Sequence, residues 1–468
     1  MKQERAHALD ALRGYAIMTM ILSATEAFRV LPAWMYHAQV PPPDHVFNPS
    51  IYGITWVDLI FPFFLFSMGA AIPLSLGRQY TAGASLGKLC RKSVIRWLKL
   101  AFFAIFIYHT FPFMLGYRQE WLRYAVPLAG FALMFVLYVP NPFRLPELWR
   151  RIVNGAAYVV AGAILVLQPY ADGKPFSPND YDTIILILSN VAVVGSIIYL
   201  FTMKKPYVRF VVMAFIVALF LSSETDGSWQ QAVCSFTPVA WLYQPAFLKY
   251  LLIILPGTFA GNMLYRWQSE YGATDADKVT ERHVAPLALA VVLSVIIVNV
   301  IFLYCRMMAV NLAVTVLLLA VLHWILKGDG AETKLWRTLF HHGAFYLLLG
   351  LCMEAFQGGI RKDDVTFSYL FTTTGLAFLA LLAFSVISDH YRCSFISKPL
   401  ELTGKNPMIA YVASSMVVIP VLILLGIYRY IDMLSVAAWT GFLKGIILTA
   451  LSMGVAVCFT KRKCFWKT

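Results

Sequence analysis

Long apolar runs separated by short polar segments dominate this chain. The clearest runs span residues 55–75, 182–202, 284–304, 307–326, 367–387 and 436–459, and weaker ones span 14–30, 93–116, 122–140, 153–168, 207–222, 246–265, 338–356 and 407–427. A helix needs about 20 apolar residues to cross a bilayer. The pattern therefore predicts an all-α, polytopic integral membrane protein, a bundle of about 12–14 transmembrane helices. No linker or internal repeat divides the runs, so residues 1–468 are expected to form a single transmembrane domain.

The composition agrees with this pattern. Hydrophobic residues make up 60% of the chain and charged residues 13%, with a mean hydropathy of +0.69. Soluble domains carry roughly 25% charged residues. These values exclude a secreted disulfide scaffold, a disordered regulator and a soluble nucleic-acid binder. The seven cysteines show no metal-binding spacing and are expected to be small buried hydrophobes.

The charges indicate how the chain is oriented. It carries 38 basic and 24 acidic residues, a net charge of +14. If the N-terminus is cytoplasmic and the spans alternate, 28 of the 38 basic residues fall on the inner side, whereas the acidic residues divide almost evenly. This is the positive-inside distribution. It predicts that both termini are cytoplasmic. Because the basic residues are dispersed over many inner loops, no nucleic-acid partner is expected.

The first outer loop, residues 31–54, is the most unusual segment. It reads LPAWMYHAQVPPPDHVFNPSIYGI and contains five prolines and two histidines, His37 and His45. Three consecutive prolines predict an extended, stiff path. Asp58 follows within the first turn of the next span, where a carboxylate is costly unless it is paired or solvated. We therefore interpret one of these histidines as a group that moves a proton or another group and is oriented by a carboxylate, because histidine titrates near neutrality.

Two other interpretations of this loop remain open. The histidines can be incidental residues of a polar surface loop. A metal site built from His37, His45, Asp44 and Asp58 is the other alternative, although these residues form no tight i, i+2 or i, i+4 ligand pair.

Five segments together carry a family resemblance. They are LDALRGYAI (9–17), GITWVDLIFPFFLFSMGAAIPLS (53–75), IRKDDVTFSYLFTTTGLAF (360–378), LTGKNPMIAYV (402–412) and KRKCFWKT (461–468). In this order, with the histidine loop between the first two, they resemble the transmembrane acyltransferases related to heparan-alpha-glucosaminide N-acetyltransferase. The motifs are clearest at 9–75 and 360–468.

This resemblance implies an acetyltransferase that spans the membrane. Acetyl-CoA would be the co-substrate on the cytoplasmic side, the acceptor would be an amino sugar or related glycan group on the outer side, and no metal would be needed. His37 and Asp58 match the catalytic histidine and the carboxylate of the D-L-x-F-P block. The chain departs from the family at Ser23 and Thr25, where an asparagine is usual, and through the insert PPPDHVFNPS, so the acceptor stays open. We expect a bacterial inner (cytoplasmic) membrane.

The phosphates of acetyl-CoA are expected at the basic inner face. Candidate residues are Arg13 with Asp10, and Lys405 with Asn406. Asn406 is expected to cap a helix that begins at Pro407, and a helix N-terminus beside a lysine is a natural phosphate site. The alternative is a plain capped helix with a lysine that follows the positive-inside rule.

Three residues are candidates for supporting the acceptor side. Lys362 lies in a segment that matches the family and would stabilise the oxyanion, unless it only extends to the membrane interface. His45 and Glu26 are the others, and Glu26 is spaced to pair with Arg29 on one helix face.

Other functions also fit many spans with intramembrane charges. One is a transporter of sugars or cell-envelope intermediates, and another is a lipid-modifying acyltransferase. Within the first interpretation, His37 can act as a general base or as a covalent acetyl relay. The sequence leaves these choices, and the existence of a homo-oligomer, undecided.

Overall fold

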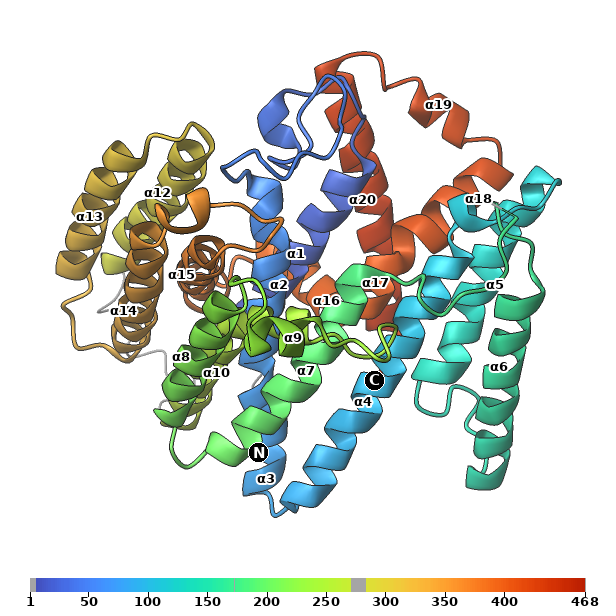
Figure 1. The fold of residues 1–468 in the computed structure, drawn as a ribbon, viewed down its shortest axis with the longest axis horizontal. Helices are drawn as coiled ribbons and strands as arrows, with labels where there is room; N and C mark the ends of the chain where they lie inside the picture. The colour runs from blue at the N-terminus through green and yellow to red at the C-terminus, as the bar shows by residue number, and fades with distance from the viewer. Residues whose placement is uncertain (1–5, 172, 271–282, 468) are drawn as a thin grey trace.

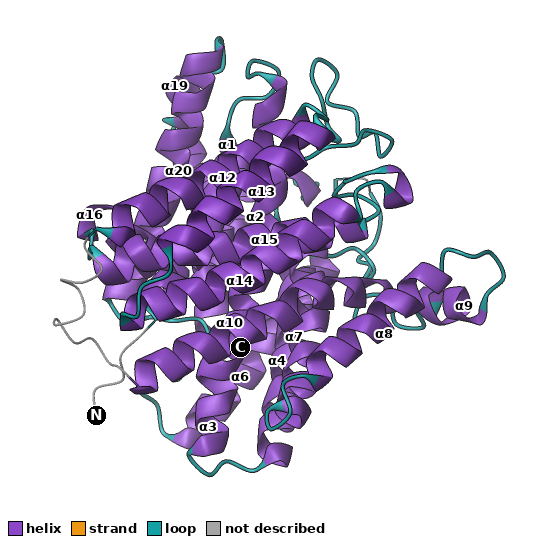
Figure 2. Cartoon of the chain, turned by 90° about the vertical axis from the view of Figure 1, so that its left-hand side faces the viewer, coloured by secondary structure: helices purple, strands orange, loops and turns teal. Residues whose placement is uncertain are grey.

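The structure is a computed structural model, which describes residues 6–171, 173–270 and 283–467. Helices account for nearly all of its regular structure (Figures 1 and 2). Apart from an isolated bridge between Leu115 and Tyr170, these residues form no β-structure. The all-α prediction is confirmed.

The helices follow the predicted runs closely. They are α1 (His7–Thr25), α2 (Trp56–Ile72), α3 (Arg78–Thr81), α4 (Leu86–Thr110), α5 (Glu120–Tyr138), α6 (Glu147–Leu167), α7 (Thr183–Thr202), α8 (Val208–Ser222), α9 (Trp229–Ser235), α10 (Leu251–Glu270), α12 (Val284–Tyr304), α13 (Met308–Ile325), α14 (Ala331–Cys352), α15 (Phe367–Phe384), α16 (Ser394–Gly404), α17 (Pro407–Ala413), α18 (Ile419–Leu424), α19 (Tyr428–Asp432) and α20 (Ala438–Lys461). Short π-helical turns extend α2, α15 and α17. Each of the fourteen predicted runs coincides with a helix.

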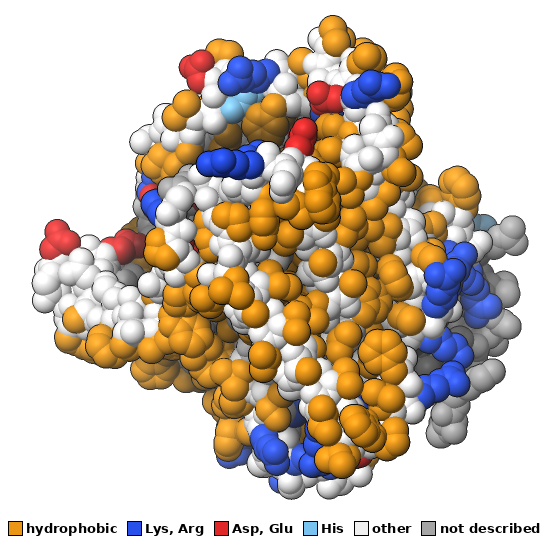
Figure 3. Space-filling view, turned by 90° about the vertical axis from the view of Figure 1, so that its right-hand side faces the viewer, with side chains coloured by type: hydrophobic (Ala, Val, Ile, Leu, Met, Phe, Trp, Pro, Cys, Tyr) orange, Lys and Arg blue, Asp and Glu red, His pale blue; other side chains and the backbone are white. Residues whose placement is uncertain are grey.

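Among the described residues, eleven helices are long and apolar enough to cross a membrane. Two more, α1 and α14, have similar lengths but are not among these eleven, and α8 has 15 residues. The chain is therefore an integral membrane protein with a polytopic helical bundle. Figure 3 shows a broad apolar surface on one side of the molecule, with Lys and Arg side chains gathered along its lower and right-hand margins.

The two ends of the bundle differ. The loop 31–54 lies at one end, together with α19, and α3 lies at the opposite end (Figure 1). The loop holds the two histidines singled out above, and α3 leads into the basic first turns of α4. The predicted outer and inner groups are therefore separated by the height of the bundle.

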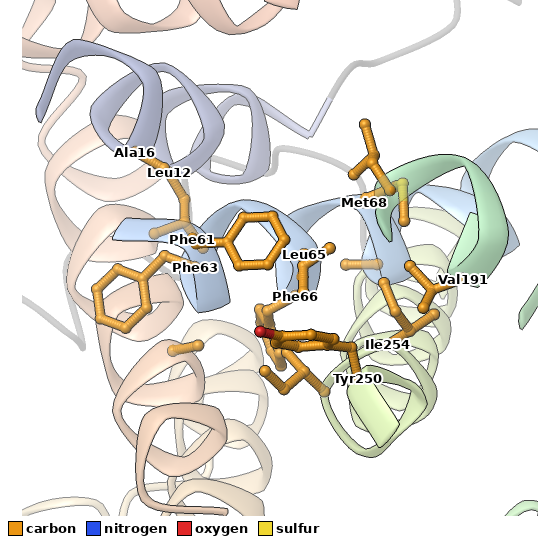
Figure 4. Close-up of a cluster of buried hydrophobic side chains, with 14 of the residues drawn as sticks. Leu12, Ala16, Phe61, Phe63, Leu65, Phe66, Met68, Val191, Tyr250 and Ile254 are labelled. Atoms are coloured by element: carbon orange, nitrogen blue, oxygen red, sulfur yellow. The ribbon is translucent and has the colours of Figure 1, made fainter. Parts of the chain in front are cut away.

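Helix α2 runs through the centre of the bundle. Phe61 and Phe66 of α2 pack among side chains from α1 and α10, including Leu12 and Ile254 (Figure 4). Most of α2, α10 and α15 is buried, whereas α6, α12 and α13 expose apolar faces. Because α2 is held on all sides, the residues of its first turn are fixed in position.

Small residues bring α2 and α10 into close contact. A Cβ atom added to Gly257 would lie 2.5 Å from the carbonyl oxygen of Phe66, and one added to Gly261 would lie 2.2 Å from the carbonyl oxygen of Ala70. Small residues four apart let two membrane helices approach to backbone contact. A larger residue at either position would push α10 away from the helix that carries Asp58.

The proline-rich loop does not follow the extended path predicted for it. It turns at residues 42–44, where the Pro42–Pro43 bond is cis, and the amide of His45 donates to the carbonyl of Pro41 at 3.1 Å. The Gln39 side-chain amide donates to the carbonyl of Ile51 at 3.0 Å. These bonds fold the loop back on itself, because its end must return to the start of α2.

Candidate functional site

The site begins with the N-terminal cap of α2. The hydroxyl of Thr55 accepts from the amide of Val57 at 3.3 Å, and the carboxylate of Asp58 accepts from the amide of Thr55 at 2.9 Å. This reciprocal pair is a capping box, which satisfies two donors at the helix start. The Thr55 hydroxyl also donates to the carbonyl of Tyr36 at 2.7 Å, which ties the histidine loop to the helix.

His37 and Asp58 form the centre of the site, as predicted. Nδ1 of His37 lies 2.8 Å from Oδ1 of Asp58, and the amide of Ala38 lies 3.3 Å from Oδ2. The Asp58 side chain is fully buried, whereas 38% of the His37 side chain is exposed. A carboxylate on Nδ1 selects the tautomer that carries its proton there. Nε2 is then the ring nitrogen without a proton, the one that can act as a base.

Lys362 completes the group across a large distance in sequence. Its Nζ lies 3.2 Å from Nδ1 and 3.3 Å from Nε2 of His37. The segment that carries it is fixed by a hydrogen bond from the amide of Gly53 to the carbonyl of Ile360 at 2.8 Å. The Tyr369 hydroxyl, on α15, donates to the Asp58 carbonyl at 2.7 Å. A carboxylate and an ammonium therefore hold one imidazole between them at the N-terminal end of α2.

Glu26 lies elsewhere, and its predicted pairing with Arg29 is wrong. Glu26 is buried against α20, where a Cβ on Gly445 would lie 3.1 Å from its Cα, and neither carboxylate oxygen has a hydrogen-bond partner. Arg29 has a φ of 71°. The chain has left the helix before Arg29, so the i, i+3 spacing no longer puts the two side chains on one face.

His45 belongs to an aromatic cluster rather than to the hydrogen-bonded group. Its ring centroid lies 5.0 Å from that of Phe28 and 4.6 Å from that of Tyr36, and its ring nitrogens are buried without a partner. The described residues contain no group of three or more His, Cys, Asp and Glu side chains that could hold a metal ion.

A polar cavity opens beside the segment that carries Lys362. It has a volume of about 440 Å³ and is lined by charged residues of both signs, including Glu224, Lys249, Arg361 and Asp364. Arg361 pairs with Asp364 at 3.1 Å. Hydroxyl and amine groups of a polar ligand would find both donors and acceptors here.

A second cavity, of about 410 Å³, lies among α1, α2, α4, α7 and α17, and extends to the C-terminal segment. Its cationic lining residues are Arg13, Lys92, Arg96 and Lys467, and its apolar wall includes Phe64. Phe64 follows Asp58 by six residues, roughly 9 Å along the helix. The cavity therefore joins the basic end of the bundle to the level just below the His37 group.

Two guanidinium groups face this cavity. Arg13 donates to the carbonyls of Gly404 and Ser67 at 3.4 and 3.2 Å and lies 3.6 Å from Asp10, the other candidate residue on α1. The Nε of Arg96 is buried without a partner. Our sequence reasoning missed Arg96 as a site residue. The sequence feature that could have identified it is the spacing of Lys92, Arg96 and Lys99, which puts three cations on one side of α4.

Lys405 and Asn406 do not line this cavity. Lys405 pairs with Glu401 at 3.5 Å. Asn406 occupies the position before α17 but makes no capping hydrogen bond, so the prediction of a side-chain cap is wrong. Its amide instead donates to the carbonyl of Cys464 at 2.7 Å, and its oxygen accepts from the amide of Trp466. The C-terminal segment therefore forms hydrogen bonds with the side chain that would otherwise cap the helix.

The fold and the site together define a polytopic helical membrane protein with a histidine–carboxylate–lysine group at one end and a basic cavity toward the other. The chain belongs to the family described as Domain of unknown function (DUF5009), whose sequence model matches residues 5–264. The matched part includes His37, Asp58, Arg13 and Arg96, and Lys362 lies beyond it. A search of curated proteins finds no match to the chain.

Proposed function

We propose that the protein is a membrane-embedded acetyltransferase that uses cytoplasmic acetyl-CoA to acetylate an amino sugar or related glycan group on the outer side of a bacterial inner membrane. The observation that carries the proposal is the half-exposed His37 ring, whose Nδ1 lies 2.8 Å from the fully buried Asp58. The resemblance to acyltransferases related to heparan-alpha-glucosaminide N-acetyltransferase supplies the reaction class.

The chemistry needs a base, a stabilised oxyanion and aligned reactants. Nε2 of His37 takes the proton as the acceptor amine attacks the carbonyl carbon of the acetyl thioester. The ammonium of Lys362, about 3.3 Å from Nε2, is close enough to stabilise the oxyanion that develops. The C–S bond then breaks, the new amide is released, and the proton passes from His37 to the CoA thiolate. A covalent acetyl-histidine route would use the same nitrogen as nucleophile.

The inner cavity supports the donor half of this proposal. Two guanidinium groups that line one cavity favour a phosphate-bearing ligand, although one of them, Arg13, also pairs with Asp10. Arg13 and Arg96 supply them, and the apolar wall that rises along α2 toward Phe64 suits a thin pantetheine arm. The phosphates would stay at the basic end while the thioester approaches His37.

The outer polar cavity supports the acceptor half. Its carboxylates and cations, Glu224, Lys249, Arg361 and Asp364, suit a ligand rich in hydroxyl and amine groups. A wholly apolar acceptor would make no polar contact with these groups. The cavity thus favours a sugar-like acceptor over the lipid acceptor of the alternative acyltransferase.

The deciding experiment uses purified protein in detergent with [14C]acetyl-CoA and a panel of amino sugars. Wild type is compared with His37→Ala and with a matched control, His341→Ala, which changes an exposed histidine of α14. We expect label transfer in wild type and in the control and at least a hundredfold loss in His37→Ala. Equal melting temperatures show that the variants are folded.

Two results would overturn the proposal. Full transfer by His37→Ala would remove the histidine from the reaction. Absence of both transfer and acetyl-CoA binding, with accumulation of a sugar in proteoliposomes, would favour the transporter instead. Release of CoA in a burst without acceptor would identify the acetyl-histidine route.

A further inference from the structure

A second, larger cavity at the basic end of the bundle is not used by the acetyl transfer. It has a volume of about 950 Å³ and lies between the start of α4 and the hairpin of α5 and α6. Seven cationic side chains line it and no carboxylate does: Lys88, Arg91, Lys92, Lys99, Arg150, Arg151 and Lys467.

Little negative charge offsets these cations. Glu147 pairs with Arg151 at 2.7 Å and with Arg150 at 3.4 Å. Within the described part of the chain, no ion pair involves Lys88 or Arg91. One carboxylate thus lies beside seven cations. The cavity therefore has a positive electrostatic potential that favours an anionic ligand.

Part of the cavity wall is apolar. Ile95 lines it and is 43% exposed, and Leu137 and Val139 line its other side. Above it, Phe102 of α4 contacts Tyr158 of α6, with ring centroids 5.2 Å apart, so the two helices close over the groove. The first turns of α6 expose apolar side chains, and the apolar surface on this side of the molecule is continuous above a basic margin (Figure 3).

We propose that this groove is a binding site for an anionic phospholipid of the inner leaflet. Its cations take the phosphodiester headgroup, and the exposed apolar faces of α4 and α6 take the acyl chains. Basic pockets between membrane helices on the cytoplasmic side bind such headgroups. A free phosphate or nucleotide would use the cations alone, whereas the apolar walls beside them fit only a ligand that also carries a hydrocarbon part.

The site is separable from the donor cavity. Lys92 and Lys467 line both cavities, but Arg150 and Arg151 line only this one, and Arg96 lines only the donor cavity. The proposal therefore does not depend on acetyl transfer, and variants of Arg150 and Arg151 test it alone.

The test is native mass spectrometry of the purified full chain titrated with dioleoyl-phosphatidylglycerol, dioleoyl-phosphatidylcholine or glycerol-3-phosphate. The variant is the double substitution Arg150→Gln with Arg151→Gln. The matched control is Lys204→Gln with Lys205→Gln, which removes the same charge from the exposed loop after α7. We expect wild type and control to prefer phosphatidylglycerol, and the variant to bind it about 25-fold more weakly, roughly fivefold for each cation.

Several results would overturn the proposal. Unchanged phosphatidylglycerol binding by the double variant, an equal loss in the control, or equal binding of phosphatidylcholine would each do so. Binding of glycerol-3-phosphate as tightly as the lipid would assign the site to a soluble anion. If the double variant does not fold, the test uses Arg91→Gln instead, which changes a single exposed residue of α4. We then expect phosphatidylglycerol to bind about fivefold more weakly.

Discussion

Replacement of Asp58 by asparagine tests the proposed role of the buried carboxylate. Asparagine keeps the size of the side chain and one oxygen acceptor. That oxygen can still accept from the amides of Thr55 and Ala38, which lie 2.9 and 3.3 Å from Oδ2. The new NH₂ group then faces Nδ1 of His37. Nδ1 becomes an acceptor, the ring proton moves to Nε2, and Nε2 can no longer act as a base.

The size of the effect follows from the contact that is lost. A hydrogen bond to a charged group contributes about 1.5–3 kcal/mol, and each 1.36 kcal/mol is tenfold in rate. Loss of the 2.8 Å bond between His37 and Asp58 therefore lowers the rate about 10- to 150-fold, and the wrong tautomer adds to this. General-base catalysis as a whole contributes about 10²–10⁴-fold. We expect kcat of Asp58→Asn to fall by about 10²–10³-fold.

The assay is steady-state acetyl transfer by purified wild type and Asp58→Asn, with acetyl-CoA and acceptor varied in turn. The KM for acetyl-CoA should change little, because the donor cavity begins roughly 9 Å further along α2. Asp58→Ala is the contrast: it leaves the buried amides of Thr55 and Ala38 without an acceptor, at about 1–3 kcal/mol each, and should lower the melting temperature as well. A folded Asp58→Asn within threefold of the wild-type kcat would refute the tautomer argument.

Three further predictions concern the surroundings of the site. Lys362→Met should lower kcat about 10- to 100-fold, because it removes the cation beside the developing oxyanion. Lys362→Arg should retain part of the wild-type kcat, because the charge matters more than the exact shape of the side chain, and steady-state kinetics measure both effects. Arg96→Gln should raise the KM for acetyl-CoA about five- to tenfold with kcat unchanged, and an unchanged KM would remove the donor cavity from the proposal. Burial alone would raise the pKa of Glu401, but the hydrogen bond from His7 and the charges of His7 and Lys405 hold it below its ordinary value. This stabilisation is present above the unfolded pKa and lost as pH falls through the lower folded pKa. The melting temperature of Glu401→Gln should therefore lie below that of wild type at pH 6, and the difference should shrink as the pH falls below about 4. A difference that stays constant with pH would contradict the role of the pair.

The local part of the site could be predicted from the sequence. Asp58 was singled out because a carboxylate at the start of an apolar run is costly, and Thr55 three residues earlier gives the spacing of a capping box. His37 lies in the long loop before that run and was singled out over His45 by its match to the histidine motif of the family it resembles. Their contact at 2.8 Å joins residues that are 21 positions apart in the sequence. The loop that carries His37 leads directly into the predicted start of the helix that carries Asp58, so the two side chains were already expected at the same end of that helix.

Other parts could not be predicted from local patterns. Arg29 and Asn406 had suitable spacing and residue type, but a left-handed backbone at Arg29 and the returning segment at Trp466 changed their partners. His45 lies nearer to Asp58 in sequence than His37 does, but it packs in an aromatic cluster. The errors at Asn406 and His45 came from tertiary contacts that overrode a local rule, whereas the error at Arg29 came from the end of the helix before it.

The sequence by itself determined the membrane class, the fourteen helical runs and the two residues at the centre of the site. It did so because the length of an apolar run and the cost of a charge within it are local quantities that a bilayer imposes on each segment. Only the tertiary structure decided that Lys362 meets His37 across 325 residues and that Arg13 and Arg96 face one cavity. These arrangements depend on how the helices pack against α2, which backbone contact at small residues fixes and which no single segment specifies.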